Sequence, residues 1–94
     1  QELPSLTFPP ASFDVVTLLE VLEHLDDPRA GAAEALRVAR RFVIASVPST
    51  PDENPEHLRF FEEAALRDLL LAAGAAKVDL VHVPNHRIAI ARLP

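Results

Sequence analysis

The stretch FDVVTLLEVLEHLDDP at residues 13–28 decides the fold of this chain. Its first part, residues 13–19, carries one acid and one hydroxyl and is otherwise large and apolar. This pattern is typical of a parallel strand that is covered on both faces. Ionisable side chains follow at once, at Glu20, Glu23 and His24. Because ligands of open parallel sheets bind beyond the carboxyl ends of the strands, the stretch predicts a functional site at this turn.

A helix is expected to follow the turn. Asp26 or Asp27 can cap its amino end, and Pro28 suits its first turn, where a backbone N–H has no helical partner. The arginines that we expect near its carboxyl end, where they complement the helix dipole, are Arg37, Arg40 and Arg41. The alanine-rich face of this helix suits close packing on a sheet.

Two further strands and a helix pattern complete the α/β order. Residues 42–47 read as a second apolar strand, ended by Pro48. A helix over residues 62–73 has leucines spaced for one buried face and ends at Gly74. Residues 77–83 and 87–93 read as strands whose short link permits only an antiparallel pair. The predicted order is β-α-β-α-β-β, with the last strand antiparallel.

Composition limits the class of protein. The chain has 94 residues, a formal net charge of −5 and no cysteine. It is one domain or part of one, and disulfide or thiol chemistry is excluded. The acidic balance gives no basic surface for nucleic acid or an anionic membrane. No apolar stretch approaches the roughly 20 residues that a bilayer requires. We expect a soluble, cytoplasmic protein without nucleic-acid or membrane partners.

Several motifs together resemble class I S-adenosylmethionine-dependent methyltransferases of the small-molecule and quinone-type branch. Residues 13–28 are similar to the family's fourth strand and the turn after it, and residues 3–12 to the loop before that strand. Residues 43–48 resemble its fifth strand, NPEHLRF at 54–60 the stretch before the next helix, and LRDLLLAAG at 66–74 that helix. The implied fold is a partial Rossmann-like sandwich in which the last strand lies antiparallel between the two before it.

The resemblance covers only the C-terminal half of the family's domain. Residues 1–94 would form that half, with residues 1–12 as an extended lead-in. The family's cofactor lies against a glycine-rich loop, whereas Gly31 and Gly74 are the only glycines in this chain. We therefore expect the glycine-rich, cofactor-binding half to be absent and this chain to be inactive by itself.

The resemblance also implies an activity and site residues. The activity is methyl transfer from S-adenosylmethionine to a small molecule. Leu19, Glu20 and Val21 would line the methionine end of the cofactor. His24 would lie near the methyl acceptor as a general base or orienting group, a role suited to histidine, whose unperturbed pKa is near neutrality. His57 would also line the acceptor pocket.

A metal site is an alternative for the same residues. A helical turn at 20–24 would put Glu20, Glu23 and His24 on one face, and His57 could join them from a later loop. This set is similar to the divalent metal site of small-RNA 3′-end 2′-O-methyltransferases, and its ligand types suit such an ion. The acidic charge of the chain does not suit an RNA enzyme, so our prediction is a site without metal.

A non-catalytic half-domain is the alternative from another class. Residues 13–19 would pair with an earlier strand in the whole fold, so in this chain they predict an exposed apolar sheet edge. Such an edge favours association, and we expect an interaction module or a homodimer through it. His82 and His86, in the last hairpin, are expected on the surface and away from the site.

Overall fold

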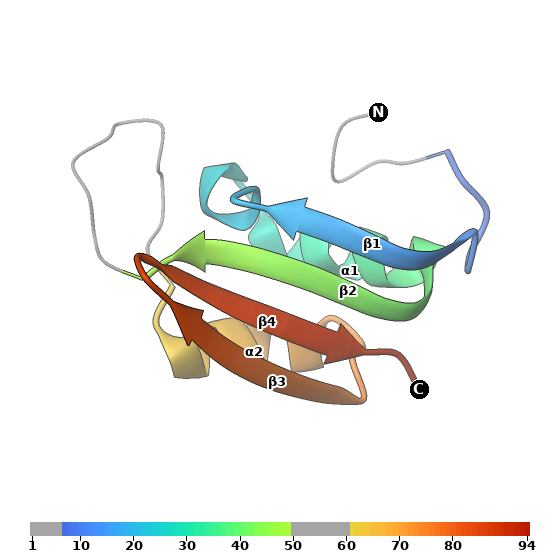
Figure 1. Ribbon diagram of the computed structural model, residues 1–94. Coiled ribbons are helices and arrows are strands. Elements are labelled where there is room, and N and C mark those ends of the chain that lie inside the picture. The colour runs from blue at the N-terminus through green and yellow to red at the C-terminus, as the bar shows by residue number, and fades with distance from the viewer. Residues whose placement is uncertain (1–6, 50–60) are drawn as a thin grey trace.

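A computed structural model describes residues 7–49 and 61–94 of the chain (Figure 1). The elements are β1 (Phe13–Leu19), the short 3-10 helix η1 (Leu22–His24), α1 (Pro28–Val38), β2 (Ala39–Pro48), α2 (Glu63–Ala72), β3 (Lys77–Val83) and β4 (His86–Arg92). The predicted α/β order is thus confirmed. None of the helices in these two ranges is long and apolar enough to cross a bilayer.

The four strands form one mixed sheet in the order β1-β2-β4-β3 (Figure 1). β1 is parallel to β2, while β4 is antiparallel to both β2 and β3. This is the order that the resemblance implies. The register between β2 and β4 runs from Phe42 opposite Arg92 to Pro48 opposite His86. The β3–β4 turn therefore lies at the carboxyl end of β2, beside the end of β1.

Both helices lie on the same face of the sheet, α1 behind β1 and β2, and α2 behind β3 and β4 (Figure 1). Ala32 and Ala35 of α1 are fully buried, and their small side chains permit a close approach to the sheet. Leu66 and Leu70 of α2 are also fully buried, which stabilises the fold by about 1.5–3 kcal/mol for each side chain. The core they contact on the sheet consists mainly of Leu18, Val43, Ala45, Val47, Ala89 and Ala91.

The other face of the sheet is not covered by α1 or α2 (Figure 1). Residues on this face alternate with the core residues along each strand, as the pleat requires. Across the middle of the sheet, Ile44 of β2 lies opposite Ile90 of β4 and both remain partly accessible. Val15 of β1 and Val81 of β3 are each 46% exposed.

The start of α1 confirms the predicted cap, whereas its end differs from the prediction. Asp27 accepts a hydrogen bond from the backbone N–H of Ala30 at 3.1 Å, and Pro28 is the first helical residue. The backbone becomes extended at Ala39, which already pairs with β1. Arg40 and Arg41 therefore lie in β2, and the prediction that they complement the helix dipole is wrong. The guanidinium of Arg40 instead pairs with Asp14.

The end of α2 confirms Gly74 as its C-terminal cap. Gly74 has a φ of 124°, a value that a residue with a side chain rarely adopts. Its N–H donates to the carbonyl of Leu71, and the N–H of Ala75 donates to that of Leu70. These two bonds form a Schellman motif, which satisfies carbonyls at the helix end. At the other end Glu62 is the N-cap residue, without a side-chain capping bond.

Candidate functional site

The carboxyl end of β1 is built around a residue with an uncommon backbone. Glu20, the first residue after the strand, has a φ of 54°. Its N–H donates to the Ser46 carbonyl at 2.9 Å and to the Ser46 Oγ at 3.2 Å, so β2 fixes the turn. A non-glycine residue in this region costs about 1–3 kcal/mol and persists where the surroundings enforce it. Such conformations concentrate at functional sites, so this turn is a candidate site.

Beyond Glu20 the chain forms the 3-10 turn η1. Leu22 and Glu23 are fully buried there, and His24 is half-buried at the end of the turn. Because the backbone of Glu20 is in the left-handed region, Glu20 lies outside this turn and its side chain is exposed. The prediction that a helical turn puts Glu20, Glu23 and His24 on one face is therefore wrong.

The proposed metal ligands do not gather in the part of the chain that the structure describes. Within residues 7–49 and 61–94, no three His, Asp or Glu side chains are placed to hold a metal ion. His57, the fourth ligand of that hypothesis and a predicted acceptor-site residue, lies outside the described residues.

A residue that we expected elsewhere lies next to Glu20. The Nε2 atom of His86 is 2.5 Å from the Oε1 atom of Glu20. The prediction that His86 lies away from the site is wrong, because the antiparallel β4 begins at the carboxyl end of β2. The strand order was predictable, and it already implied this position. His82, on β3, does lie apart and pairs with Glu63 of α2 at 3.4 Å.

Both ring nitrogens of His86 face hydrogen-bond acceptors. Nε2 contacts the Glu20 carboxylate, and Nδ1 lies 3.3 Å from the Pro84 carbonyl oxygen. Only the protonated imidazole donates from both nitrogens. The bond to Glu20 is the main reason that the pKa of His86 is raised, followed by the bond to Pro84. Desolvation opposes the rise, and the charges of Glu20 and Glu23 add to it.

The predicted cofactor-binding residues differ in accessibility. The side chain of Leu19 is 64% exposed and points away from the core, although it is large and apolar. Val21 is partly buried and packs against the core. Leu19 lies opposite Ser46 in the sheet, and Glu20 contacts both Ser46 and His86, so pairing and hydrogen bonds link these four residues at the carboxyl end of β1 and β2.

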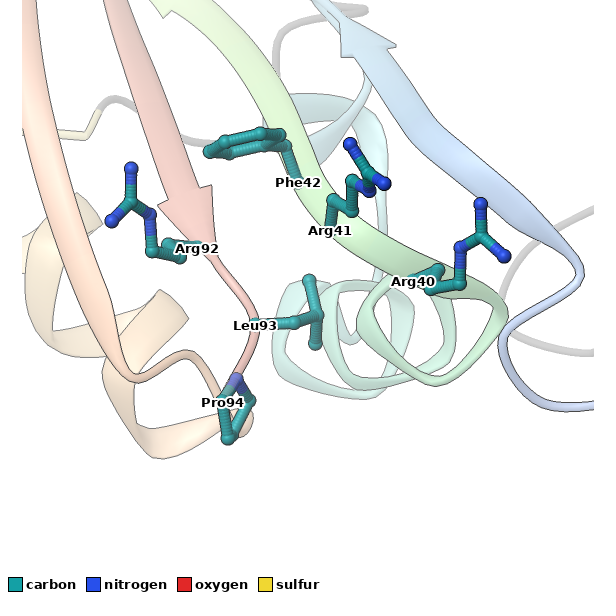
Figure 2. A pocket seen from close by; sticks show the side chains of 6 residues that line it. All are labelled: Arg40, Arg41, Phe42, Arg92, Leu93 and Pro94. Atoms are coloured by element: carbon teal, nitrogen blue, oxygen red, sulfur yellow. The ribbon is translucent and has the colours of Figure 1, made fainter.

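A pocket lined by arginines lies at the opposite end of the sheet (Figure 2). It has a volume of about 320 Å³ and is lined by Arg40, Arg41, Phe42, Arg92, Leu93 and Pro94. The guanidinium of Arg92 lies 5.4 Å from the ring centroid of Phe42, a cation–π contact. The length of β2 separates this pocket from Glu20 and His86, so it is not part of the candidate site.

Comparison with known proteins identifies the family. A family profile described as a methyltransferase domain matches residues 1–44, which include β1, the turn at Glu20 and α1. A probable S-adenosylmethionine-dependent methyltransferase of Mycolicibacterium smegmatis is 36% identical over an alignment that covers 86% of this chain and 35% of that protein. By these two comparisons the chain is a partial-length relative of S-adenosylmethionine-dependent methyltransferases. The predicted family and its cofactor, S-adenosylmethionine, are thereby confirmed.

Solved structures share the fold of this chain. An S-adenosylmethionine-dependent methyltransferase of Aquifex aeolicus matches with a TM-score of 0.80 at 19% identity, over 100% of this chain and 53% of that one. One of Thermotoga maritima, described as a possible histamine N-methyltransferase, matches with a TM-score of 0.79 at 17% identity, over 96% of this chain and 60% of that one. The chain thus spans about a third of the Mycolicibacterium relative and just over half of these two structures.

Proposed function

We propose that this chain is the C-terminal half of a class I methyltransferase domain whose whole protein methylates a small molecule. The observation that carries the proposal is the left-handed Glu20 at the carboxyl end of β1, inside the segment that matches the family profile. Its carboxylate and the exposed Leu19 offer one charged and one apolar group at the edge where parallel sheets bind ligands.

The chemistry of these groups fits the cofactor's methionine end. That end carries an α-carboxylate, an aliphatic chain and two positively charged groups, the ammonium and the sulfonium. Glu20 supplies a negative charge that attracts these groups, and the exposed side chain of Leu19 supplies apolar contact. Leu19, Glu20 and Val21 are thus proposed to bind the methionine end. When bound, the cofactor supplies an activated methyl group, and the protein aligns it with the acceptor and excludes water.

His24 and His57 are proposed to act on the acceptor side. His24 is half-buried at the end of η1, four residues along the chain from Glu20. A histidine in this place can take the proton that an acceptor hydroxyl or amine loses, or orient that group, because its ordinary pKa is near neutrality. The resemblance implies that His57 also lies on the acceptor side of the site.

The rest of the cofactor site is proposed to come from residues outside this chain. The chain contains two glycines, of which Gly31 is buried within α1 and Gly74 caps α2. Neither is available for a phosphate- or cofactor-binding loop of the kind that the family uses. The coverage of 35% of the Mycolicibacterium relative agrees with this division. We expect the chain alone to be inactive, and we keep a cytoplasmic location as part of the proposal.

One observation favours a second function, that of an interaction module. β1 is an edge strand, and its Phe13, Val15 and Leu19 side chains are 42%, 46% and 64% exposed. An exposed apolar edge is a template for pairing with another strand. A homodimer of this chain through residues 13–19 is therefore the alternative proposal.

Calorimetric titration with S-adenosylmethionine tests the two proposals. We would compare this chain with an extended protein that also contains the polypeptide encoded immediately upstream. Binding by the extended protein alone supports the divided cofactor site. Binding by neither protein would reject the methyltransferase proposal and leave the interaction module. An extended Glu20→Ala variant that binds as tightly as the unmodified protein would reject the proposed role of Glu20.

A further inference from the structure

We infer that His86 is a positioning residue of this site, whose imidazole holds the Glu20 carboxylate toward the methionine end of the cofactor. The inference rests on the proposed function, because that function gives Glu20 its role. None of the predicted site residues lies on the β3–β4 hairpin, so the inference adds this hairpin to the elements that form the site.

The two side chains are brought together by the topology of the sheet. They lie 66 residues apart in sequence, and their heavy atoms approach to 2.5 Å. Insertion of β4 beside β2 pairs His86 with Pro48, and the carbonyl of Asn85 accepts a hydrogen bond from the N–H of Ser49 at 2.9 Å. The hairpin is thus attached to the carboxyl end of β2 through its turn and the first residue of β4.

Each partner is also held in its own position. The N–H of Glu20 is bound by Ser46, and its left-handed backbone directs the following chain into η1. The ring of His86 contacts the Pro84 carbonyl through Nδ1, which leaves Nε2 for the carboxylate. An imidazole fixed through one nitrogen presents the other in a defined direction. The carboxylate therefore has one preferred orientation.

Stability does not account for this arrangement. The side chains of His86 and Glu20 are 40% and 44% exposed, and pairs at such exposure contribute little to the free energy of folding. The left-handed conformation of Glu20 costs free energy. This arrangement lowers stability at the end of a strand. Binding of a ligand by the Glu20 carboxylate explains it better than a structural role.

The hairpin supplies a matched control. His82 also pairs with a glutamate, Glu63, and these side chains are 52% and 49% exposed. This second pair joins β3 to α2 and includes none of the proposed site residues. Substitution of His82 removes a histidine–glutamate pair of similar exposure without touching Glu20.

The experiment compares steady-state kinetics of the extended protein with those of its His86→Ala, His86→Gln and His82→Ala variants. We expect His86→Ala to raise the KM for S-adenosylmethionine about tenfold, as for loss of a hydrogen bond to a charged group, while kcat changes less than about twofold. His86→Gln should restore most of the affinity, because its amide nitrogen lies near the position of Nε2. His82→Ala should change neither constant.

A double mutant separates positioning from a general effect on folding. In a Glu20→Gln background, His86→Ala should add little to the rise in KM, since the two residues act through one contact. Additive effects, or a His86→Ala variant that matches His82→Ala, would overturn the inference. If the unmodified extended protein fails to bind S-adenosylmethionine, the proposed function fails as a whole. If it binds and only the His86 effect is absent, the positioning role alone is rejected.

Discussion

Ser46 holds Glu20 in its left-handed conformation by accepting the N–H of Glu20 at 2.9 Å through its carbonyl and at 3.2 Å through its hydroxyl. Glycine adopts this conformation without strain, whereas alanine does not. We therefore expect the free energy of unfolding of Glu20→Gly to be about 1 kcal/mol higher than that of Glu20→Ala. Both variants lose the carboxylate, but only the alanine variant keeps the backbone strain. Chemical denaturation measures the difference. Equal stabilities would show that the turn is not strained.

The hydrogen bond between Glu20 and His86 predicts a pH dependence of stability. Because the pKa of His86 is raised in the folded state, its contribution is fully present below the ordinary histidine pKa and is lost as the pH rises through the raised value. The Tm of the native chain should thus exceed that of Glu20→Gln more at pH 5.5 than at pH 9. A nuclear magnetic resonance titration of His86 should show its pKa fall in Glu20→Gln. An unchanged pKa would contradict the assignment of its cause.

The cap of α1 can be tested by removing its side-chain acceptor. Asp27→Ala should lower the free energy of unfolding by about 1 kcal/mol, because the N–H of Ala30 loses its partner. Asp27→Asn is the control, since its amide oxygen can accept the same hydrogen bond. If thermal denaturation gives equal losses for both variants, the capping bond is not the source of the stability.

The attachment of α2 to the sheet depends on its buried leucines. Leu66→Ala and Leu70→Ala should each destabilise the chain by about 2–5 kcal/mol, because both side chains are fully buried. Leu71 is 41% exposed on the same helix, so Leu71→Ala is the matched control and should cost much less. Similar losses for Leu71 and Leu66 would indicate a different rotation of the helix.

The edge of β1 is the predicted surface for self-association. Val15→Lys should abolish any dimer of this chain, because a charged side chain on an edge strand opposes strand pairing. The control is Val81→Lys on the other edge strand, β3, since both valines are 46% exposed. β3 already carries Lys77 and Asp79, which make its edge less suited to pairing. Light scattering that finds a monomer in the native chain, or a dimer that survives Val15→Lys, would reject this interface.

The elements that sequence reasoning identified are those with a local signal. Apolar runs marked the strands and leucine spacing marked α2. Asp26 or Asp27 and Gly74 marked helix ends through the bonds that such residues form. The strand order came from the resemblance to a family. The structure confirms each of these features.

The features that sequence reasoning missed depend on local backbone conformation and strand register. Side-chain spacing assumes one helical conformation, so it could not show that Glu20 leaves the turn at a φ of 54°. The strand at Arg40 and Arg41 begins earlier than its apolar run, because pairing with β1 starts at Ala39. The position of His86 follows from the order and register of β2 and β4, which no local pattern contains. Only the strand order that the resemblance implies could have indicated it.

The tight turn between β3 and β4 makes the length of the hairpin a constraint on how the site can evolve. Only Pro84 and Asn85 separate the two strands, and Asn85 takes a φ of 70° to close the turn. A residue inserted there in a descendant gene would displace position 86 from Glu20, even if every amino acid of the strands stayed the same. Selection on this hairpin should therefore act more strongly against insertions than against substitutions in β3.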